Sequence, residues 1–150
     1  MANRVETELT DELLPLLKQE QYVTIATVDH ETGAPNVNAI SWVYAPNTKS
    51  VRFSIDNRSR IVENIKKQSL VTLTLIGAGS TYSITGNARI LLEKMEEVPL
   101  KLALIEITVK EVRDVMFYGS RITTGPKYEK TYDKEAADKL DRQVMSAMKK

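Results

Sequence analysis

Two arginines flank a serine at Arg58, Ser59 and Arg60, directly after a short strand-like apolar pattern. The preceding Asp56 and Asn57 are typical helix N-caps, so the pattern predicts that a strand ends and a helix begins here. Free backbone N–H groups and the positive end of the helix dipole gather at such a start, which makes cationic side chains unfavourable. A bound anion removes this repulsion. Two guanidinium groups beside a hydroxyl therefore indicate a phosphate site.

The alternative is that both arginines face solvent or pair with neighbouring acids such as Glu63. Few other residues indicate chemistry. The sequence has no Cys and a single His, which excludes thiolate chemistry and argues against a His-rich metal centre. That residue, His30, lies in a polar turn, where we expect it to be exposed and not a catalytic base. No catalytic residue can be named from the sequence.

Composition places the chain among ordinary globular proteins. Its 150 residues are 42% hydrophobic and 27% charged, with a formal net charge of +1. This length fits one domain over residues 1–150 with a sizeable core. The near-neutral charge argues against a nucleic-acid binder, and no apolar run approaches the ~20 residues of a membrane span. We expect a cytoplasmic protein with no signal peptide.

Hydrophobic periodicity predicts a mainly β protein with flanking helices. A closed or partly closed antiparallel barrel is the favoured arrangement, and an open sandwich is the alternative. The second of the expected strands, 35–45, is strongly polar on neither face and should be covered on both. The expected strands are 22–28, 35–45, 50–55, 70–76, 80–92 and 102–117, and the expected helices are 7–20, 58–68 and one after the polar stretch 119–132.

Three local irregularities are also predicted. Gly86 lies inside a strand, which indicates a bulge or the close approach of another backbone. In 102–117 the inward phase changes from odd to even positions, which predicts a bulge near Lys110–Glu111. The last helix should bury one face, formed by Ala137, Leu140, Val144 and Met148.

Three motifs follow one another along the chain, in TIATVDHETGAPNVNAISWVY (24–44), VRFSIDNRSRIVENIKKQSLVTLTL (51–75) and YSITGNARIL (82–91). With the order of the elements, they resemble the FMN-binding split-barrel family of pyridoxamine 5′-phosphate oxidase-like proteins, including its general stress protein branch. The resemblance covers residues 10–92. It implies a six-stranded antiparallel Greek-key split barrel.

The resemblance also implies FMN as cofactor, held at the interface of a homodimer. The Ser59–Arg60 pair would grip the phosphate, the backbone of 39–43 would follow the isoalloxazine, and the partner subunit's strand would close the site. The family often has Lys directly after the Arg, where this chain has Ile61. Arg58, on the other side of the Ser59–Arg60 pair, could supply the missing charge. The implied cofactor-binding residues are Ala39, Ile40, Ser41, Trp42, Val43, Ser54, Ile55, Arg58, Ser59, Arg60, Thr81 and Tyr82.

Some roles remain open at this point. Trp42 either lines the flavin or packs in the core or an interface. The segment 119–127 either binds a second phosphate or is purely structural. The function is either a flavin-dependent oxidoreductase acting on an unidentified small substrate, or a non-catalytic stress protein that stores, carries or senses with FMN. A deazaflavin or haem is a more distant alternative to FMN.

Overall fold

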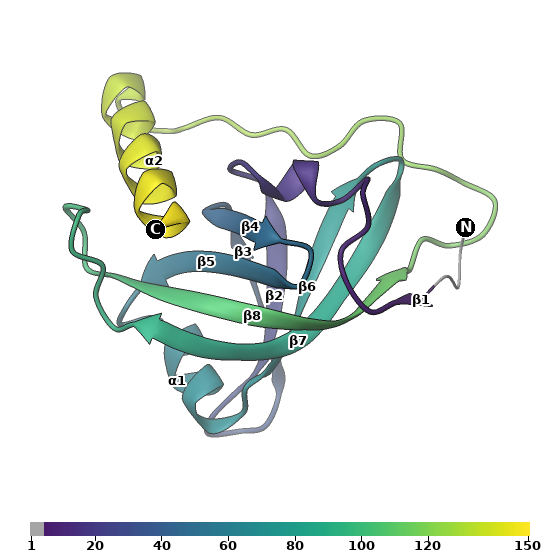
Figure 1. Cartoon of the computed structure of the whole chain (residues 1–150), viewed down its shortest axis with the longest axis horizontal. Helices are drawn as coiled ribbons and strands as arrows, with labels where there is room; N and C mark the ends of the chain where they lie inside the picture. Colours follow the sequence, from purple (N-terminus) through teal and green to yellow (C-terminus); the bar gives the residue numbers. More distant parts are fainter. Residues whose placement is uncertain (1–4) are drawn as a thin grey trace.

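Alternating apolar residues build one antiparallel sheet in the computed structural model, which describes residues 5–150 (Figure 1). Eight strands form the sheet, two more than predicted. One extra strand is a short N-terminal pairing with β8, and the other results from a break in the predicted strand 35–45. The strands are β1 (Val5–Glu6), β2 (Val23–Val28), β3 (Pro35–Ile40), β4 (Val43–Asn47), β5 (Ser50–Asp56), β6 (Leu70–Gly77), β7 (Ser80–Leu92) and β8 (Leu102–Asp114).

The sheet runs in the order β3-β2-β6-β7-β8-β5-β4, so that β3 and β4 are its two edges. Only Ser41 and Trp42 separate these edges along the chain, so the sheet curls until its margins meet at this break. The prediction of one strand over 35–45 was therefore wrong. The Ser41 carbonyl accepts the N–H groups of both Gln21 and Val43, and this turns the chain out of the β2 ladder.

The core fills the inside of this curled sheet. Val51, Phe53 and the inward residues of β8 are buried as the periodicity predicted. The predicted bulge is confirmed, because Thr85 pairs with Glu111 while Gly86 pairs with Val109, and Lys110 is left over. The close approach at Gly86 is confirmed too. A Cβ there would lie 2.1 Å from the Thr108 carbonyl oxygen.

The predicted helix over 7–20 is wrong. Within that range only the 3₁₀ turn η1 (Pro15–Leu17) is helical. Pro15 stands at the start of this turn, and its missing N–H and bulky ring prevent an α-helix from continuing through it from Thr10. The apolar pattern nevertheless has a role, because Leu9, Leu13 and Leu17 are buried in the barrel core.

Two α-helices flank the barrel, α1 (Arg60–Lys67) and α2 (Lys134–Lys149). The buried face of α2 is confirmed: Ala137, Val144 and Met148 are buried, and Leu140 packs beside a second core cluster. Arg52 on β5 donates to the carbonyl of Met148 at 2.8 Å and to Glu106 on β8 at 2.9 Å, which fastens the end of α2 to the sheet.

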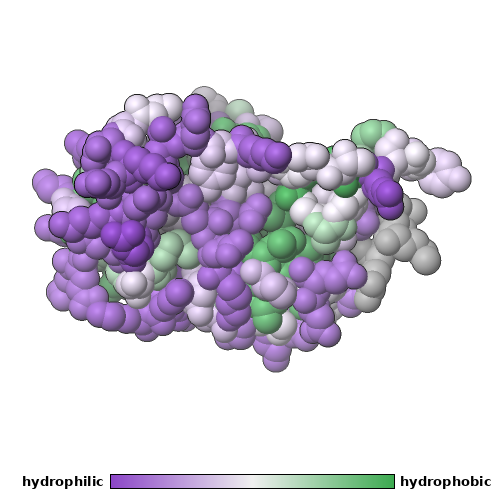
Figure 2. All heavy atoms as spheres, turned by 90° about the horizontal axis from the view of Figure 1, so that it is seen from above, coloured by the Kyte–Doolittle hydropathy of each residue, from purple (hydrophilic) through white to green (hydrophobic). Residues whose placement is uncertain are grey.

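The segment 115–133 joins β8 to α2 across the top of the barrel (Figure 1). Strand β8 ends at Asp114 and not at 117, because the Asp114 carboxylate accepts the Met116 N–H and turns the chain away. Seen from this side, the surface is largely hydrophilic, with some hydrophobic residues exposed between hydrophilic ones (Figure 2). No helix among residues 5–150 has the length and apolar composition that crossing a bilayer requires.

Candidate functional site

The junction between β5 and α1 brings Arg58, Ser59 and Arg60 together, as predicted. Ser59 is the N-cap of α1, and its Oγ accepts the Ile61 N–H at 3.1 Å. The prediction of Asp56 or Asn57 as N-cap was wrong. Asp56 instead accepts the backbone N–H of Arg58 at 2.8 Å, which forms a turn that delays the helix until Arg60.

The two guanidinium groups have different partners. Arg58 grips the Asp56 carboxylate through both Nε (3.2 Å) and Nη2 (3.1 Å), and its side chain is 83% exposed. Arg60 reaches across to Asp29 in the β2–β3 turn, where its Nε lies 2.6 Å from Oδ2. Both arginines thus pair with acids, as the alternative interpretation expected, although neither pairs with Glu63. The Arg60 side chain remains 54% exposed.

Asp29 is the buried centre of this arrangement and is 6% exposed. Its Oδ1 accepts the N–H groups of Glu31 and Thr32, and its Oδ2 accepts the Asn36 amide at 2.9 Å besides Arg60. The Arg60 guanidinium, together with these other donors, holds the pKa of Asp29 well below its usual range. Asp29 is therefore a carboxylate throughout the physiological pH range.

A second polar network lies beneath the first and fixes α1 to the same turn. Asn64 is fully buried, donates to Thr27 Oγ1 at 2.9 Å, and accepts the His30 N–H at 2.8 Å. Its Oδ1 also lies 2.8 Å from Nδ1 of His30. The expectation of an exposed His30 was wrong, because this contact leaves its side chain only 26% exposed.

Fewer backbone amides are available at the helix start than the sequence predicted. The N–H of Asn57 bonds to Lys101, that of Ser59 to Asp56, and that of Ile61 to the Ser59 side chain. These three N–H groups are already bonded, so any anion bound here would depend on side chains more than on spare amides. Ile61 is 3% exposed and belongs to the core.

Strand β3 leads away from this junction as an edge of the sheet. Asn36, beside Asp29, lies at one end of β3, and the predicted residues Ala39 and Ile40 lie at the other. Four residue steps separate Asn36 from Ile40, which is roughly 13 Å along a strand. Ala39 is exposed, and β3 pairs only with β2 among residues 5–150. Contrary to prediction, β3 is thus mostly uncovered within one chain.

Several predicted residues turn their side chains into the protein. Trp42 packs with the second core cluster and donates from Nε1 to Asp141 on α2 at 2.9 Å. Ser54 is buried and donates to the carbonyl of Ala103. Ser41 and Trp42 use their carbonyls to accept backbone N–H groups. The remaining members of this inward group are Val43 and Ile55, both buried in the barrel core.

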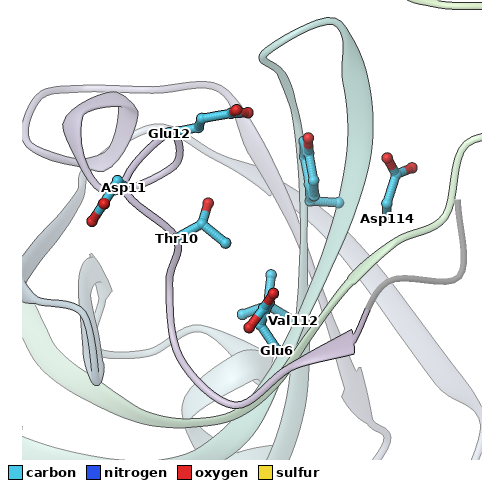
Figure 3. A pocket seen from close by; sticks show the side chains of 7 residues that line it. Glu6, Thr10, Asp11, Glu12, Val112 and Asp114 are labelled. Atoms are coloured by element: carbon cyan, nitrogen blue, oxygen red, sulfur yellow. The ribbon is translucent and has the colours of Figure 1, made fainter. Parts of the chain in front are cut away.

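Thr81 and Tyr82 lie at the far end of the sheet from Arg60. The register Val23–Leu75–Tyr82 puts Tyr82 six residues along β2 from Asp29, on the order of 20 Å. Tyr82 also borders a hollow that is poorly suited to a phosphate, because four acidic side chains line it (Figure 3). These acids come from β1, the segment before η1, and β8: Glu6, Asp11, Glu12 and Asp114.

Sequence reasoning missed Asp29, Asn36 and Asn64, which hold the cationic side of the site together. The sequence around His30 predicts only a polar turn. One signal was available: Asp29 is the first residue of the loop between β2 and β3, a position where an Asp side chain often bonds to nearby backbone N–H groups. The pairing with Arg60 joins residues 31 positions apart and could not be predicted from local spacing.

Comparisons with known proteins agree with this fold. The sequence model of the pyridoxamine 5′-phosphate oxidase family matches residues 9–116. HupZ of group A Streptococcus has a similar structure, with a TM-score of 0.59 and 18% identity over 76% of this chain and 98% of that one. General stress protein 26 from Bacillus anthracis gives a TM-score of 0.53 and 12% identity, over 65% and 86% of the two chains.

An F420 reductase is similar as well, with a TM-score of 0.54 and 20% identity over 65% of this chain and 93% of that one. At these identities the likeness shows a shared fold, and the predicted split-barrel class is confirmed. No curated protein matches the sequence.

Proposed function

The chain belongs to the pyridoxamine 5′-phosphate oxidase family, and from this premise we propose that it binds FMN and acts as a flavin-dependent oxidoreductase on a small substrate. The observation that carries the proposal is the half-exposed guanidinium of Arg60 at the start of α1, next to the open edge of β3. FMN, when bound, supplies the electron or hydride transfer, and the protein supplies binding and orientation.

The residues present fit such a ligand in two respects. Arg60 offers terminal N–H groups that Asp29 does not use, which suits the phosphate end. From there the edge of β3 runs toward Ala39 and Ile40, and on its outer side it pairs with no other strand of residues 5–150, which suits a flat ring with polar edges. Buried Asn64 fixes α1 against the β2–β3 turn, so that both parts of the site keep their relative positions.

We also propose that the protein is a homodimer. Eight residues on the outer face of four neighbouring strands are solvent-accessible, small and uncharged, which is typical of an interface core and unusual for a free surface. A partner seated there could bring its Thr81 and Tyr82 to a flavin that one chain cannot surround alone. The face consists of two cross-strand rows, Val37–Ala26–Thr72–Thr85 and Ala39–Thr24–Thr74–Ser83.

The visible absorbance spectrum of the protein, purified and then titrated with FMN, tests the cofactor. Flavin bands that persist through gel filtration are expected. A deazaflavin-type or haem spectrum, or no bound chromophore after FMN is added, would contradict the proposal. Mixing the flavin-loaded protein anaerobically with NADH or NADPH tests the activity. Rapid bleaching supports an oxidoreductase, whereas bound flavin that neither nucleotide reduces supports a flavin carrier or store.

A further inference from the structure

We infer that Asp29 is a positioning residue that orients Arg60 for a phosphate group, an inference that rests on the proposed function. The contact itself is short, with Arg60 Nε 2.6 Å from Asp29 Oδ2. Asp29 belongs to the turn between β2 and β3, and Arg60 opens α1, so the pair connects two elements that the chain brings together only in the folded state. It is the contact that decides where this guanidinium points.

The way in which Asp29 holds the guanidinium leaves most of it available. A guanidinium has five N–H donors, and Asp29 engages the one on Nε. Nη2 of Arg60 lies 3.8 Å from the Glu31 carboxylate, beyond hydrogen-bond distance. The terminal nitrogens can therefore donate in parallel to two oxygens of a phosphate, which is the geometry that makes Arg a strong phosphate ligand.

The carboxylate is rigid enough for this role. Two backbone N–H groups, of Glu31 and Thr32, bond to Oδ1, and the Asn36 amide bonds to Oδ2 beside Arg60. An acid that is 6% exposed and has four donors cannot rotate without breaking several of these bonds. Arg60 is consequently held at one position before any ligand arrives, which reduces the entropy lost on binding.

Arg58 is held by its acid in a different way from Arg60. Its Nε and Nη2 are both occupied by Asp56, a side chain that is 50% exposed. Asp56 thus competes with a phosphate for Arg58, whereas Asp29 supports Arg60. Both pairs join an arginine to an aspartate, but the structure predicts opposite effects when their acids are neutralised.

The experiment compares Asp29→Asn with Asp56→Asn, because both variants remove one negative charge next to an arginine. FMN and riboflavin affinities are measured by flavin fluorescence titration of the full-length wild type and each variant. If only the electrostatic potential at the site mattered, the loss of a negative charge would make both variants bind FMN more tightly. We expect Asp29→Asn to weaken FMN binding by roughly tenfold, with little change for riboflavin, which lacks the phosphate. Asp56→Asn should bind FMN as well as wild type or better.

A charge-conserving variant covers the case in which Asp29→Asn does not fold. In Arg60→Lys the single ammonium can pair with Asp29 or with phosphate, but not with both in parallel. FMN affinity should fall roughly tenfold although the charge is kept. Wild-type FMN affinity in Arg60→Lys would overturn the inference, as would an unchanged ratio of FMN to riboflavin affinity in Asp29→Asn. Wild-type protein that binds neither flavin would overturn the proposed function itself, a result that is distinguishable from both.

Discussion

At the scale of single residues, Arg60 is the side chain on which the proposed cofactor site most depends. Its removal takes away a charge-assisted contact but leaves Ser59, the actual helix cap, in place. We expect Arg60→Ala to keep the fold and to weaken FMN binding by roughly tenfold or more. Isothermal titration with FMN measures this. Arg58→Ala is the matched control and should have the smaller effect, because Asp56 already occupies that guanidinium.

Asn64 is the residue whose loss should be felt most in stability. It is fully buried and bonds to Thr27 and His30, so Asn64→Ala leaves their polar atoms without a partner and opens a small cavity. We expect the free energy of unfolding to fall by about 2–4 kcal/mol. Glu63→Ala, one position earlier and exposed on the same helix, should change it by less than about 0.5 kcal/mol. Urea unfolding of both variants is the measurement, and equal midpoints would contradict the network described here.

The lowered pKa of Asp29 has a consequence for acid stability. Arg60 and the other donors favour the carboxylate in the folded state, so the folded pKa is below that of the unfolded chain. Such a group contributes its full stability above an unfolded pKa of about 4, and this contribution is lost as the pH falls further. Between about pH 7 and pH 3, the Tm of the wild type should therefore fall further than the Tm of Asp29→Asn. Identical losses would mean that Asp29 is not the group responsible.

At the scale of elements, the pairing of β7 with β8 leaves no room for a side chain at Gly86. The backbones approach so closely at Gly86 that a Cβ would overlap the Thr108 carbonyl oxygen, next to the Lys110 bulge. We expect Gly86→Ala to cost about 3 kcal/mol or more, because backbone atoms must move. Gly125→Ala is the control, since its nearest atom would be 3.8 Å away. Comparable stability of both variants in chemical denaturation would contradict the close backbone approach at Gly86.

The elements also show what the sequence could and could not predict. Strand alternation, the phase change at Lys110 and the buried face of α2 are local periodicities, and these predictions were confirmed. The break at Ser41–Trp42 depends on a carbonyl that bonds to distant Gln21, so an apolar run of this kind does not reveal it. The same applies to the site. The arginines were visible in the sequence, but Asp29 as the partner of Arg60 was not, because only the fold brings the β2–β3 turn to α1.

At the scale of the whole molecule, the uncharged outer face of β3, β2, β6 and β7 is the surface that should pair two copies. In a two-fold interface each substitution appears twice and can face its own copy, so Thr72→Glu, near the centre of the face, should produce a monomer. That monomer should also lose FMN if the partner completes the site. Thr124→Glu, on the exposed segment before α2, is the control and should remain dimeric. Analytical ultracentrifugation measures the oligomeric state of each variant. A wild-type monomer that binds FMN tightly would refute this arrangement.

The connection at Ser41–Trp42 also allows the chain to be split into two fragments. The strands on either side of it belong to opposite margins of the sheet, with β3 held by β2 and β4 held by β5. Cleavage between these two residues would sever no strand-to-strand bond of either margin. Polypeptides 1–41 and 42–150, produced separately, should therefore reassociate around their shared apolar interior. The chain would then serve as a fragment-complementation pair whose reassembly could be followed by the return of flavin binding.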